Sequence, residues 1–585
     1  MLDPVTNPLF GDGLPSGKVA LESGRKRSRE VQVGASAFLD HYGVDCEITY
    51  KRQAIAEGRI MQHAQIGFRD PALSREAWTA IARAVEAEGG RVDRYGICLD
   101  WSMGYPLAER AHRGKGTGLI LEGAEAFRAL TAAGPVAPHF GDFVIGLPAA
   151  LENTTFALQA GATAIGNLGQ YFTFRMPGWA EDVATTQATV EALALCAAQP
   201  VPILIHSNLD DGFAALFTDL ACAFGAVLLE RYIVEDLIGG VIGHCYGHTF
   251  SDPLARLAFQ RALAWDRDIP GTMVYGNTTL YREAVPAAIN QAKLGSYLTI
   301  DMVAQVLLPS GHAVTPIPVT EADRIPDIGE VIDAQLHAVG LAPRAAALAD
   351  LFDIAAAEAQ TALLLEAGGR FKQRVLDGLQ TAGVAIDDPL HLLLALRRIG
   401  ARRLEELYGP GEADPAVLRG RRPVIEASPV RELRDQAEAV TACLSDTERD
   451  ALSAANLCVC IASSDVHEYG KMLLAETLRR SGIRTLDAGV HAEPEALAAL
   501  AAKEGASALA ISTYNGVALD YLRSVKAAFE AAGLSIPIFI GGKLNQIPKD
   551  SNSALPQDVS GQLRTLGAVP CRRVEDMLRT LAKGL

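Results

Sequence analysis

The sequence lacks the cysteine patterns that organise small secreted or zinc-binding proteins. Its nine cysteines are scattered over 585 residues, and no two of them form a C-x-x-C arrangement. Disulfide frameworks and structural zinc sites both need regularly spaced cysteines. We therefore expect reduced, buried cysteines that behave as small apolar residues.

Positive charge and long apolar runs are also scarce. Lysine and arginine total 53 against 69 aspartates and glutamates, so the net charge is -16 at pH 7. Such a chain lacks the cationic surface that nucleic acids and anionic membranes attract. The N-terminal segment has no basic or apolar signal region, and no apolar stretch is long enough to span a bilayer. We expect a cytoplasmic protein that binds neither partner.

The sequence does contain the composition typical of α/β proteins. The chain is also too long to fold around a single hydrophobic core. Hydrophobic residues make up 49% and aromatic residues only 6%, a usage typical of α/β enzymes. We divide the chain into an N-terminal arm (1–57), a repeating β/α region (58–320), a helical extension with a linker (321–455) and a second α/β domain (456–585).

The β/α region alternates short apolar strands with amphipathic helices, which indicates a parallel sheet. The eight candidate strands are residues 60–68, 94–100, 135–141, 162–167, 201–207, 226–233, 272–278 and 297–303. Eight such units predict a (β/α)₈ TIM-like barrel, and an open doubly wound sheet is the alternative. The second α/β domain has four or five strands in about 130 residues, which predicts a flavodoxin-like, Rossmann-like fold.

One loop of the second domain has the residues of a metal-ligand site. Ser464-Asp465-Val466-His467-Glu468-Tyr469-Gly470 follows a buried strand and precedes a helix. Asp465 is placed to accept the Nδ1–H of His467, which would direct Nε2 to a metal. The alternative is a surface histidine beside a helix-capping aspartate. The next strand ends contain Ser512-Thr513-Tyr514-Asn515-Gly516 and Gly541-Gly542, whose small residues permit close approach of a bulky ligand.

These motifs, in this order, resemble the cobalamin-binding domain, specifically the small subunit of glutamate mutase (methylaspartate mutase). The resemblance spans residues 456–585 and implies that His467 is the lower axial ligand of cobalt in adenosylcobalamin, with Asp465 orienting it. It also implies that the cofactor site includes further residues of these loops: Ser464, Val466, Glu468, Gly470, Ser512, Tyr514, Gly541 and Gly542.

The β/α region resembles, more weakly, the large subunit of the same enzyme at residues 141–167 and 308–322. A barrel would protect a radical from water. The arginines with which glutamate mutase holds its substrate are missing, and His63, the stretch 103–105 and His139 stand in their places. Asn167 replaces an expected carboxylate, and Pro309 and Ala313 replace an expected lysine and glutamate. The resemblance therefore implies a substrate other than glutamate.

Polar residues at the predicted strand ends are the candidate substrate ligands, because barrel enzymes assemble their sites there. We expect His139, Asn167 and His206 to hydrogen-bond the substrate, and we include Asp100 as a candidate catalytic residue. The leading hypothesis is an adenosylcobalamin-dependent radical mutase. The alternatives are a corrinoid methyltransferase and a non-catalytic cobalamin sensor or carrier. Methyltransferases usually have a helical cap directly before the corrinoid domain, and residues 345–405 could be mistaken for one. The oligomeric state stays open, with a homodimer as the candidate assembly.

Overall fold

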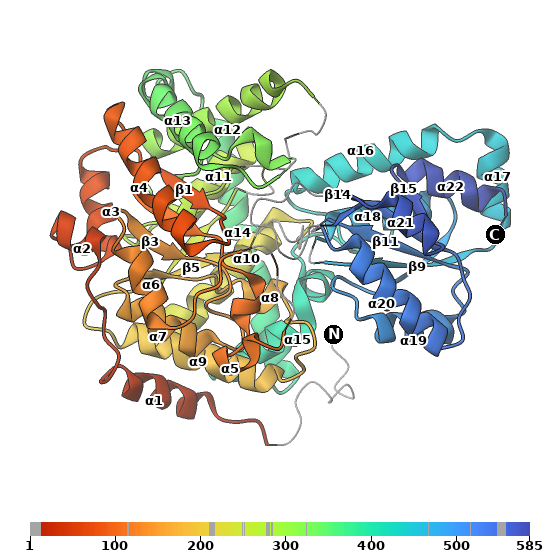
Figure 1. Cartoon of the computed structure of the whole chain (residues 1–585), viewed down its shortest axis with the longest axis horizontal. Coiled ribbons are helices and arrows are strands. Elements are labelled where there is room, and N and C mark those ends of the chain that lie inside the picture. The colour runs from red at the N-terminus through yellow and green to blue at the C-terminus, as the bar shows by residue number, and fades with distance from the viewer. Residues whose placement is uncertain are drawn as a thin grey trace. The chain divides into compact units, whose positions relative to one another are not determined.

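The computed structural model describes residues 13–113, 116, 118–209, 217–247, 250, 252–276, 281, 285–322, 324–465, 467–514, 516–546 and 557–584. The chain forms two compact units, one extending to Ala427 (unit 1) and the other beginning at Ser428 (unit 2). Both units are α/β with parallel sheets, so the predicted fold class is confirmed at this level (Figure 1).

Unit 1 has eight short parallel strands. The first six pair in sequence order, and the last two form a separate pair. Parallel bridges Tyr246↔Val274 and Gln62↔Val314 link β6 to β7 and β8 to β1. The strands are β1 (His63–Ile66), β2 (Arg94–Ile97), β3 (Ala137–Phe140), β4 (Ala164–Ile165), β5 (Leu204–Asn208), β6 (Val241–Cys245), β7 (Met273–Val274) and β8 (Ala313–Val314).

Helices connect these strands and follow them to the end of unit 1. The connecting helices are α4 (Pro71–Ala87), α5 (Leu107–Arg110), α6 (Ala124–Thr131), α7 (Ala150–Gln159), α8 (Gln170–Thr173), α9 (Asp182–Ala197), α10 (Leu220–Arg231), α11 (Pro253–Ala264) and α12 (Ala287–Leu307). The later helices are α13 (Ile328–Ala349), α14 (Ala355–Thr381) and α15 (Pro389–Tyr408).

Two of the eight predicted strands are wrong. Residues 226–233 lie in α10 and the π-helix Tyr232–Ile238 that continues it, and residues 297–303 lie in α12. Both segments are rich in apolar residues because their helices are largely buried, and such a run cannot be distinguished from a buried strand by periodicity. The true sixth and eighth strands are β6 and β8. Both are short, and a glycine and a histidine lie within β6 and directly before β8.

The segment predicted as an N-terminal arm is helical and packed. It contains α1 (Gly17–Arg27), α2 (Ala37–Tyr42) and α3 (Glu47–Ala56). Lys51 of α3 is buried, and its Nζ donates to the carbonyl oxygens of Thr272 (2.9 Å) and Gly311 (2.7 Å). Glu47 accepts from Arg94 Nε at 2.6 Å. These contacts place α3 against the amino ends of β2, β7 and β8.

Unit 2 begins before the predicted boundary at residue 456, because α16 (Ser428–Ala442) and α17 (Asp446–Ala454) pack into its core. The strand order β10-β9-β11-β12-β15 is that of a flavodoxin-like sheet. Its strands are β9 (Cys458–Ser463), β10 (Arg484–Asp487), β11 (Ala508–Thr513), β12 (Ile538–Gly542) and β15 (Val569–Cys571), with a small pair β13 (Asn545–Gln546) and β14 (Gln557–Asp558).

Two helical layers cover the sheet of unit 2. Leu478, Leu578 and Val440 pack on one face, from α18, α22 and α16, and Leu497, Leu522 and Leu563 pack on the other, from α19, α20 and α21 (Figure 1). The helices are α18 (Tyr469–Arg480), α19 (Pro494–Glu504), α20 (Ala518–Ala531), α21 (Ser560–Thr565) and α22 (Val574–Ala582).

Candidate cofactor and substrate sites

The strand order of unit 2 reverses between β9 and β11, and the predicted metal-ligand loop starts there. Ser512 of β11 pairs with Ser463 of β9, and the backbone N–H of Ser464 donates to the Ser512 carbonyl at 2.9 Å. The loops that leave the two strands are thereby held side by side. Flavodoxin-like sheets bind ligands at the carboxyl ends of strands that flank such a reversal.

His467 is held by Asp465 in one orientation and one tautomer. Asp465 Oδ1 lies 2.7 Å from His467 Nδ1 and accepts the His467 backbone N–H at 3.0 Å. Burial raises the pKa of Asp465, but the hydrogen bonds and charge of His467 outweigh burial and lower it to about 2. The aspartate is therefore ionised and accepts the Nδ1–H, which leaves Nε2 as the ring nitrogen available to a metal.

The second carboxylate oxygen of Asp465 joins this loop to β11. Oδ2 accepts the backbone N–H of Tyr514 at 2.7 Å and the hydroxyl of Ser464 at 3.2 Å. The Asp465 side chain is 2% exposed, whereas that of His467 is 21% exposed. The aspartate is thus a buried support and the imidazole reaches the surface, as an axial ligand must.

An ion-pair network fixes the start of α18, which follows the His467 loop. Lys471 Nζ donates to both oxygens of Asp487, at 2.6 and 2.7 Å, and lies 3.4 Å from Glu468 Oε1. Lys471 is almost fully buried, so these partners offset the cost of burying its charge. Glu468, predicted to contact the cofactor, supports the lysine that anchors this helix.

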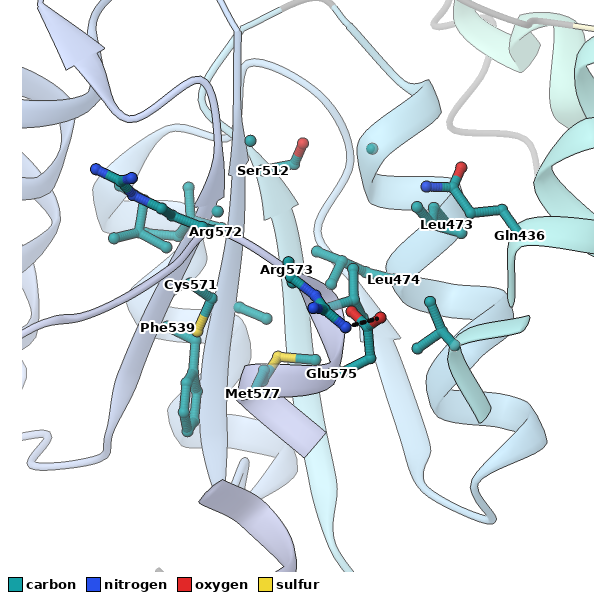
Figure 2. Close-up of a pocket in the computed structure, with 18 of the residues that line it drawn as sticks. Gln436, Leu473, Leu474, Ser512, Phe539, Cys571, Arg572, Arg573, Glu575 and Met577 are labelled. Atoms are coloured by element: carbon teal, nitrogen blue, oxygen red, sulfur yellow. Dashed lines mark hydrogen bonds and ion pairs between the residues drawn. The ribbon is translucent and has the colours of Figure 1, made fainter. Parts of the chain in front are cut away.

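A cavity of about 460 Å³ opens beside the loop, between the sheet and the helices α16, α18 and α22 (Figure 2). Its wall includes the predicted residues Gly470, Ser512, Gly541 and Gly542. The rest is mostly apolar, and Figure 2 shows Phe539, Leu474 and Met577 around it and Arg573 paired with Glu575 at 2.9 Å. Volume and lining suit an organic ligand with a flat apolar part.

Two glycines of this wall are required by space. A Cβ at Gly470 would collide with the Ser512 hydroxyl, and a Cβ at Gly542 would collide with the Thr513 carbonyl. Gly542 also has a φ of +95°, which side chains rarely adopt. The two close approaches, the apolar cavity and the imidazole with a directed lone pair fit a corrinoid whose tail enters the domain.

Of the remaining predicted cofactor residues, Tyr514 lies elsewhere and Val466 is not described. Tyr514 is not part of the cavity wall; its ring lies against His467, with ring centroids 4.3 Å apart. Val466 lies outside the described residues. No group of three or more metal-binding side chains comes together in the described part of the chain, so His467 would act as a single protein ligand.

In unit 1, three buried histidines come together from alternate strands. His63 (β1) and His139 (β3) have ring centroids 6.1 Å apart, and His139 and His206 (β5) are 4.4 Å apart. Burial is the main cause that lowers the pKa of all three well below the usual value, and the nearby Arg94 adds to it. All three imidazoles are therefore neutral near pH 7.

His139 is the histidine with unused hydrogen-bonding capacity. His63 Nε2 lies 3.0 Å from Gln65 Oε1, and His206 Nδ1 lies 2.9 Å from Thr272 Oγ1. Neither ring nitrogen of His139 has a hydrogen-bond partner among the residues that the structure describes, although the side chain is buried. A Cβ built on Gly141 would lie 2.5 Å from His139 Nε2, so this nitrogen points toward the carboxyl end of β3.

Asn167 lies in the same region, and Asp100 has a structural role. Asn167 Oδ1 accepts the backbone N–H groups of Gly169 (2.9 Å) and Asn208 (2.8 Å), so it organises the loop after β4. Asp100 Oδ1 accepts the N–H of Ser102 at 2.9 Å and caps the short helix Trp101–Gly104. Asp100 Oδ2 is buried without a hydrogen-bond partner among the described residues, so Asp100 stays a candidate catalytic residue.

The sequence analysis missed Asp142, which follows β3. Asn167 Nδ2 donates to Asp142 Oδ1 at 3.4 Å, and burial raises the pKa of Asp142 to about 6. A carboxyl group with this pKa can hold or release a proton near neutrality. The available signal was its place directly after a predicted strand, in the segment Gly141-Asp142-Phe143.

Comparison with known proteins identifies unit 2. Residues 458–559 match the family described as the B12 binding domain. No curated protein matches the chain. Among solved structures, a cobalamin-binding protein from Desulfitobacterium hafniense DCB-2 is 18% identical, with a TM-score of 0.20, and the match covers 27% of this chain and 71% of that one.

A second solved structure resembles a larger part of the chain. Phosphonopyruvate hydrolase in complex with oxalate and Mg²⁺ is 14% identical, with a TM-score of 0.27, and covers 57% of this chain and 98% of its own. Within the described residues, no helix is both long and apolar enough to cross a membrane. Taken with the geometry around His467, the family match identifies residues 458–559 of this chain as a B12-binding domain.

Proposed function

We propose that the chain is an adenosylcobalamin-dependent mutase related to glutamate mutase, acting on a small molecule other than glutamate. The observation that carries the proposal is the His467–Asp465 pair, at the strand reversal of a domain that matches the B12-binding family. Unit 2 would hold the cofactor and unit 1 the substrate.

Each described cofactor residue has a distinct task in this proposal. His467 would bind cobalt through Nε2, with Asp465 holding the ring. Gly470, Ser512, Gly541 and Gly542 would form the wall along the nucleotide tail. When bound, adenosylcobalamin supplies an organic radical by homolysis of its cobalt–carbon bond. The chain must then exclude water and hold the substrate in place.

The strand pairing of unit 1 supports a closed (β/α)₈ barrel as the substrate chamber. Parallel ladders join β1 through β6 and β7 to β8, and single parallel bridges join β6 to β7 and β8 to β1. The series of pairs is therefore cyclic. The layer of histidines from β1, β3 and β5 has the alternate-strand pattern of a barrel interior, whose catalytic end is the carboxyl end of the strands.

His139, Asn167 and His206 remain our candidates for substrate binding. A neutral imidazole can donate or accept one hydrogen bond at each nitrogen but cannot neutralise a carboxylate. Arg94, one of two cations beside these histidines with Lys51, is paired with Glu47 through Nε at 2.6 Å, and its Nη2 is buried without a partner in the described residues. These side chains suit a substrate whose reacting part is polar and uncharged, and Asp142 could exchange a proton with it.

A corrinoid methyltransferase is the second candidate. The segment 345–405, which could be mistaken for the helical cap of such proteins, contributes α14 and α15 to unit 1, where they pack on α10, α11, α8 and α9. Transfer of a labelled methyl group to bound cobalamin would favour a methyltransferase. An electron paramagnetic resonance (EPR) signal of an organic radical, seen with adenosylcobalamin and a candidate substrate, would favour the mutase.

The decisive test of the cofactor site is EPR of the protein with cob(II)alamin, after all histidines are labelled with ¹⁵N. A ¹⁵N axial ligand splits each cobalt line into a doublet, whereas the cofactor's own ¹⁴N base gives a triplet. We expect the doublet for the unaltered protein. We expect His467→Ala to lose the doublet and to bind cobalamin at least about 10-fold more weakly, because one coordination bond is lost.

The matched control is His41→Ala, which removes an exposed histidine on α2. This variant should keep the doublet and the affinity of the unaltered protein. A triplet from the labelled, unaltered protein would show that the cofactor's own base stays on cobalt, and it would overturn the assignment of His467.

A further inference from the structure

Tyr514, at the end of β11, makes a ring contact with the proposed axial ligand. The centroids of the Tyr514 and His467 rings are 4.3 Å apart, and the ring planes are tilted by 40°. Tyr514 is nonetheless 46% exposed, one of the larger exposed apolar side chains in the described chain. The contact therefore covers one side of the imidazole while the tyrosine stays at the ligand-binding edge of the sheet.

The backbone of Tyr514 is tied to the same aspartate that orients the histidine. Asp465 Oδ2 accepts the Tyr514 N–H at 2.7 Å, and Asp465 Oδ1 lies 2.7 Å from His467 Nδ1. One carboxylate thus holds both the backbone of Tyr514 and the ring of His467. These short hydrogen bonds set the distance between the two rings, although the rings belong to two separate loops.

Lys543, which follows β12, approaches the same tyrosine ring. Its Nζ lies 4.5 Å from the Tyr514 ring centroid, within the range of a cation–π contact. The backbone N–H of Lys543 donates to the Thr513 carbonyl at 2.8 Å, so the lysine is anchored beside the tyrosine. The order along this edge is Lys543, Tyr514 and His467, contributed by three neighbouring strands.

This arrangement meets a need that Asp465 alone does not meet. A hydrogen bond to Nδ1 fixes the tautomer and one point of the imidazole, but the ring can still rotate about the line of that bond. A flat ring pressed against it restricts the rotation, and aromatic contacts of this kind prefer offset or tilted geometries. The direction of Nε2 would then be set before the cofactor arrives.

We propose that Tyr514 is a positioning residue for the axial ligand: its ring holds the plane of the His467 imidazole so that Nε2 faces cobalt, and Lys543 steadies the tyrosine. This inference rests on the proposed cobalamin site. It places Tyr514 beside the metal-binding histidine, and not in the wall around the nucleotide tail.

The test compares Tyr514→Leu, Tyr514→Phe and Lys543→Met in the full chain, with cob(II)alamin and adenosylcobalamin as probes. We expect Tyr514→Leu to weaken binding about 3- to 10-fold, because an aromatic contact of ordinary strength is lost. Its EPR spectrum, with ¹⁵N-histidine, should contain a triplet component from cofactor that keeps its own base. Tyr514→Phe should behave as the unaltered protein, and Lys543→Met should have a smaller effect than Tyr514→Leu.

Two controls separate the possible failures. Equal melting temperatures of the cofactor-free variants would exclude a folding defect. If His467→Ala loses the doublet but Tyr514→Leu keeps both the doublet and full affinity, the positioning role is wrong and the cobalamin site stands. If His467→Ala changes neither readout, the proposed function itself fails. A Tyr514→Phe variant as weak as Tyr514→Leu would assign the effect to the hydroxyl and overturn the ring contact.

Discussion

At the scale of single residues, Asp465 shows why a buried charge is stable in this site. Its carboxylate is removed from water, which by itself favours the protonated form. Two backbone N–H groups and the His467 ring surround it, and their donors more than offset that cost. Because its pKa falls to about 2, the aspartate stays ionised wherever the protein is folded.

A second histidine, His491, makes the stability of unit 2 depend on pH. Burial lowers the pKa of His491 from 6.5 to about 4, although Asp465 opposes the shift. Between these values the unfolded chain binds more protons than the folded chain, so unfolding becomes easier as the pH falls. The contribution of neutral His491 to stability is fully present above its unfolded pKa. Below its folded pKa, the free energy of unfolding has fallen by about 3 kcal/mol.

We expect His491→Gln to reduce the fall in stability of unit 2 between about pH 7 and about pH 5, because the group that takes up the proton is gone. Denaturant titration at both pH values measures the free energy of unfolding. His41→Gln, at an exposed position of α2, is the control and should leave the pH dependence unchanged. Identical dependence in the unaltered protein and His491→Gln would contradict the assignment.

At the scale of elements, the close approach of α18 to β11 shapes the cofactor cavity. Gly470 lies in the first turn of α18, directly opposite the hydroxyl of Ser512. A methyl group there would meet the Ser512 hydroxyl, which must rotate or shift at the cavity wall. The glycine is thus favoured by packing between two elements, since no positive φ is involved.

We predict that Gly470→Ala destabilises unit 2 by about 1 to 3 kcal/mol and weakens cobalamin binding, as overpacking does in a dense core. The double variant Gly470→Ala with Ser512→Ala should recover part of the stability, because the Ser512 Cβ would lie 3.4 Å from the added methyl group, an ordinary contact. Thermal melting and a cobalamin titration measure the two effects. No recovery in the double variant would argue against this steric cause.

Strands could be predicted from the sequence where polar loops separate them. The prediction failed for apolar-rich runs that lie inside long helices. The four strands expected between residues 456 and 542 are all present, because each ends in a glycine, a hydroxyl-bearing residue or a charged residue. Residues 226–233 and 297–303 are rich in apolar residues and belong to largely buried helices. Burial, which the sequence does not state, decides the secondary structure of such runs.

At the scale of the whole molecule, the division into two units predicts where cobalamin acts. A ligand stabilises the folded state to which it binds, by about 2.7 kcal/mol at 100 times its dissociation constant. Hydrogen exchange with and without hydroxocobalamin should therefore slow most in β9, β11 and β12, and less in β1 to β6. Greater protection in the strands of unit 1 would contradict a cofactor site in unit 2.

The sequence by itself was enough to predict the Asp465–His467 pair of the candidate cofactor site, because its residues are close together in the chain. Asp465 and His467 are two positions apart, and a strand followed by a tight loop leaves few ways to arrange them. The B12-binding domain was predictable for the same reason, since its motifs follow one another in strand order.

Only the tertiary structure decided contacts between distant segments. It brought Tyr514 onto His467, Asp142 to Asn167, and α3 to the amino ends of β2, β7 and β8. It also assigned α16 and α17 to the cofactor unit. These contacts depend on strand register and on helix packing, which many residues across the chain determine together. No short stretch of sequence specifies them.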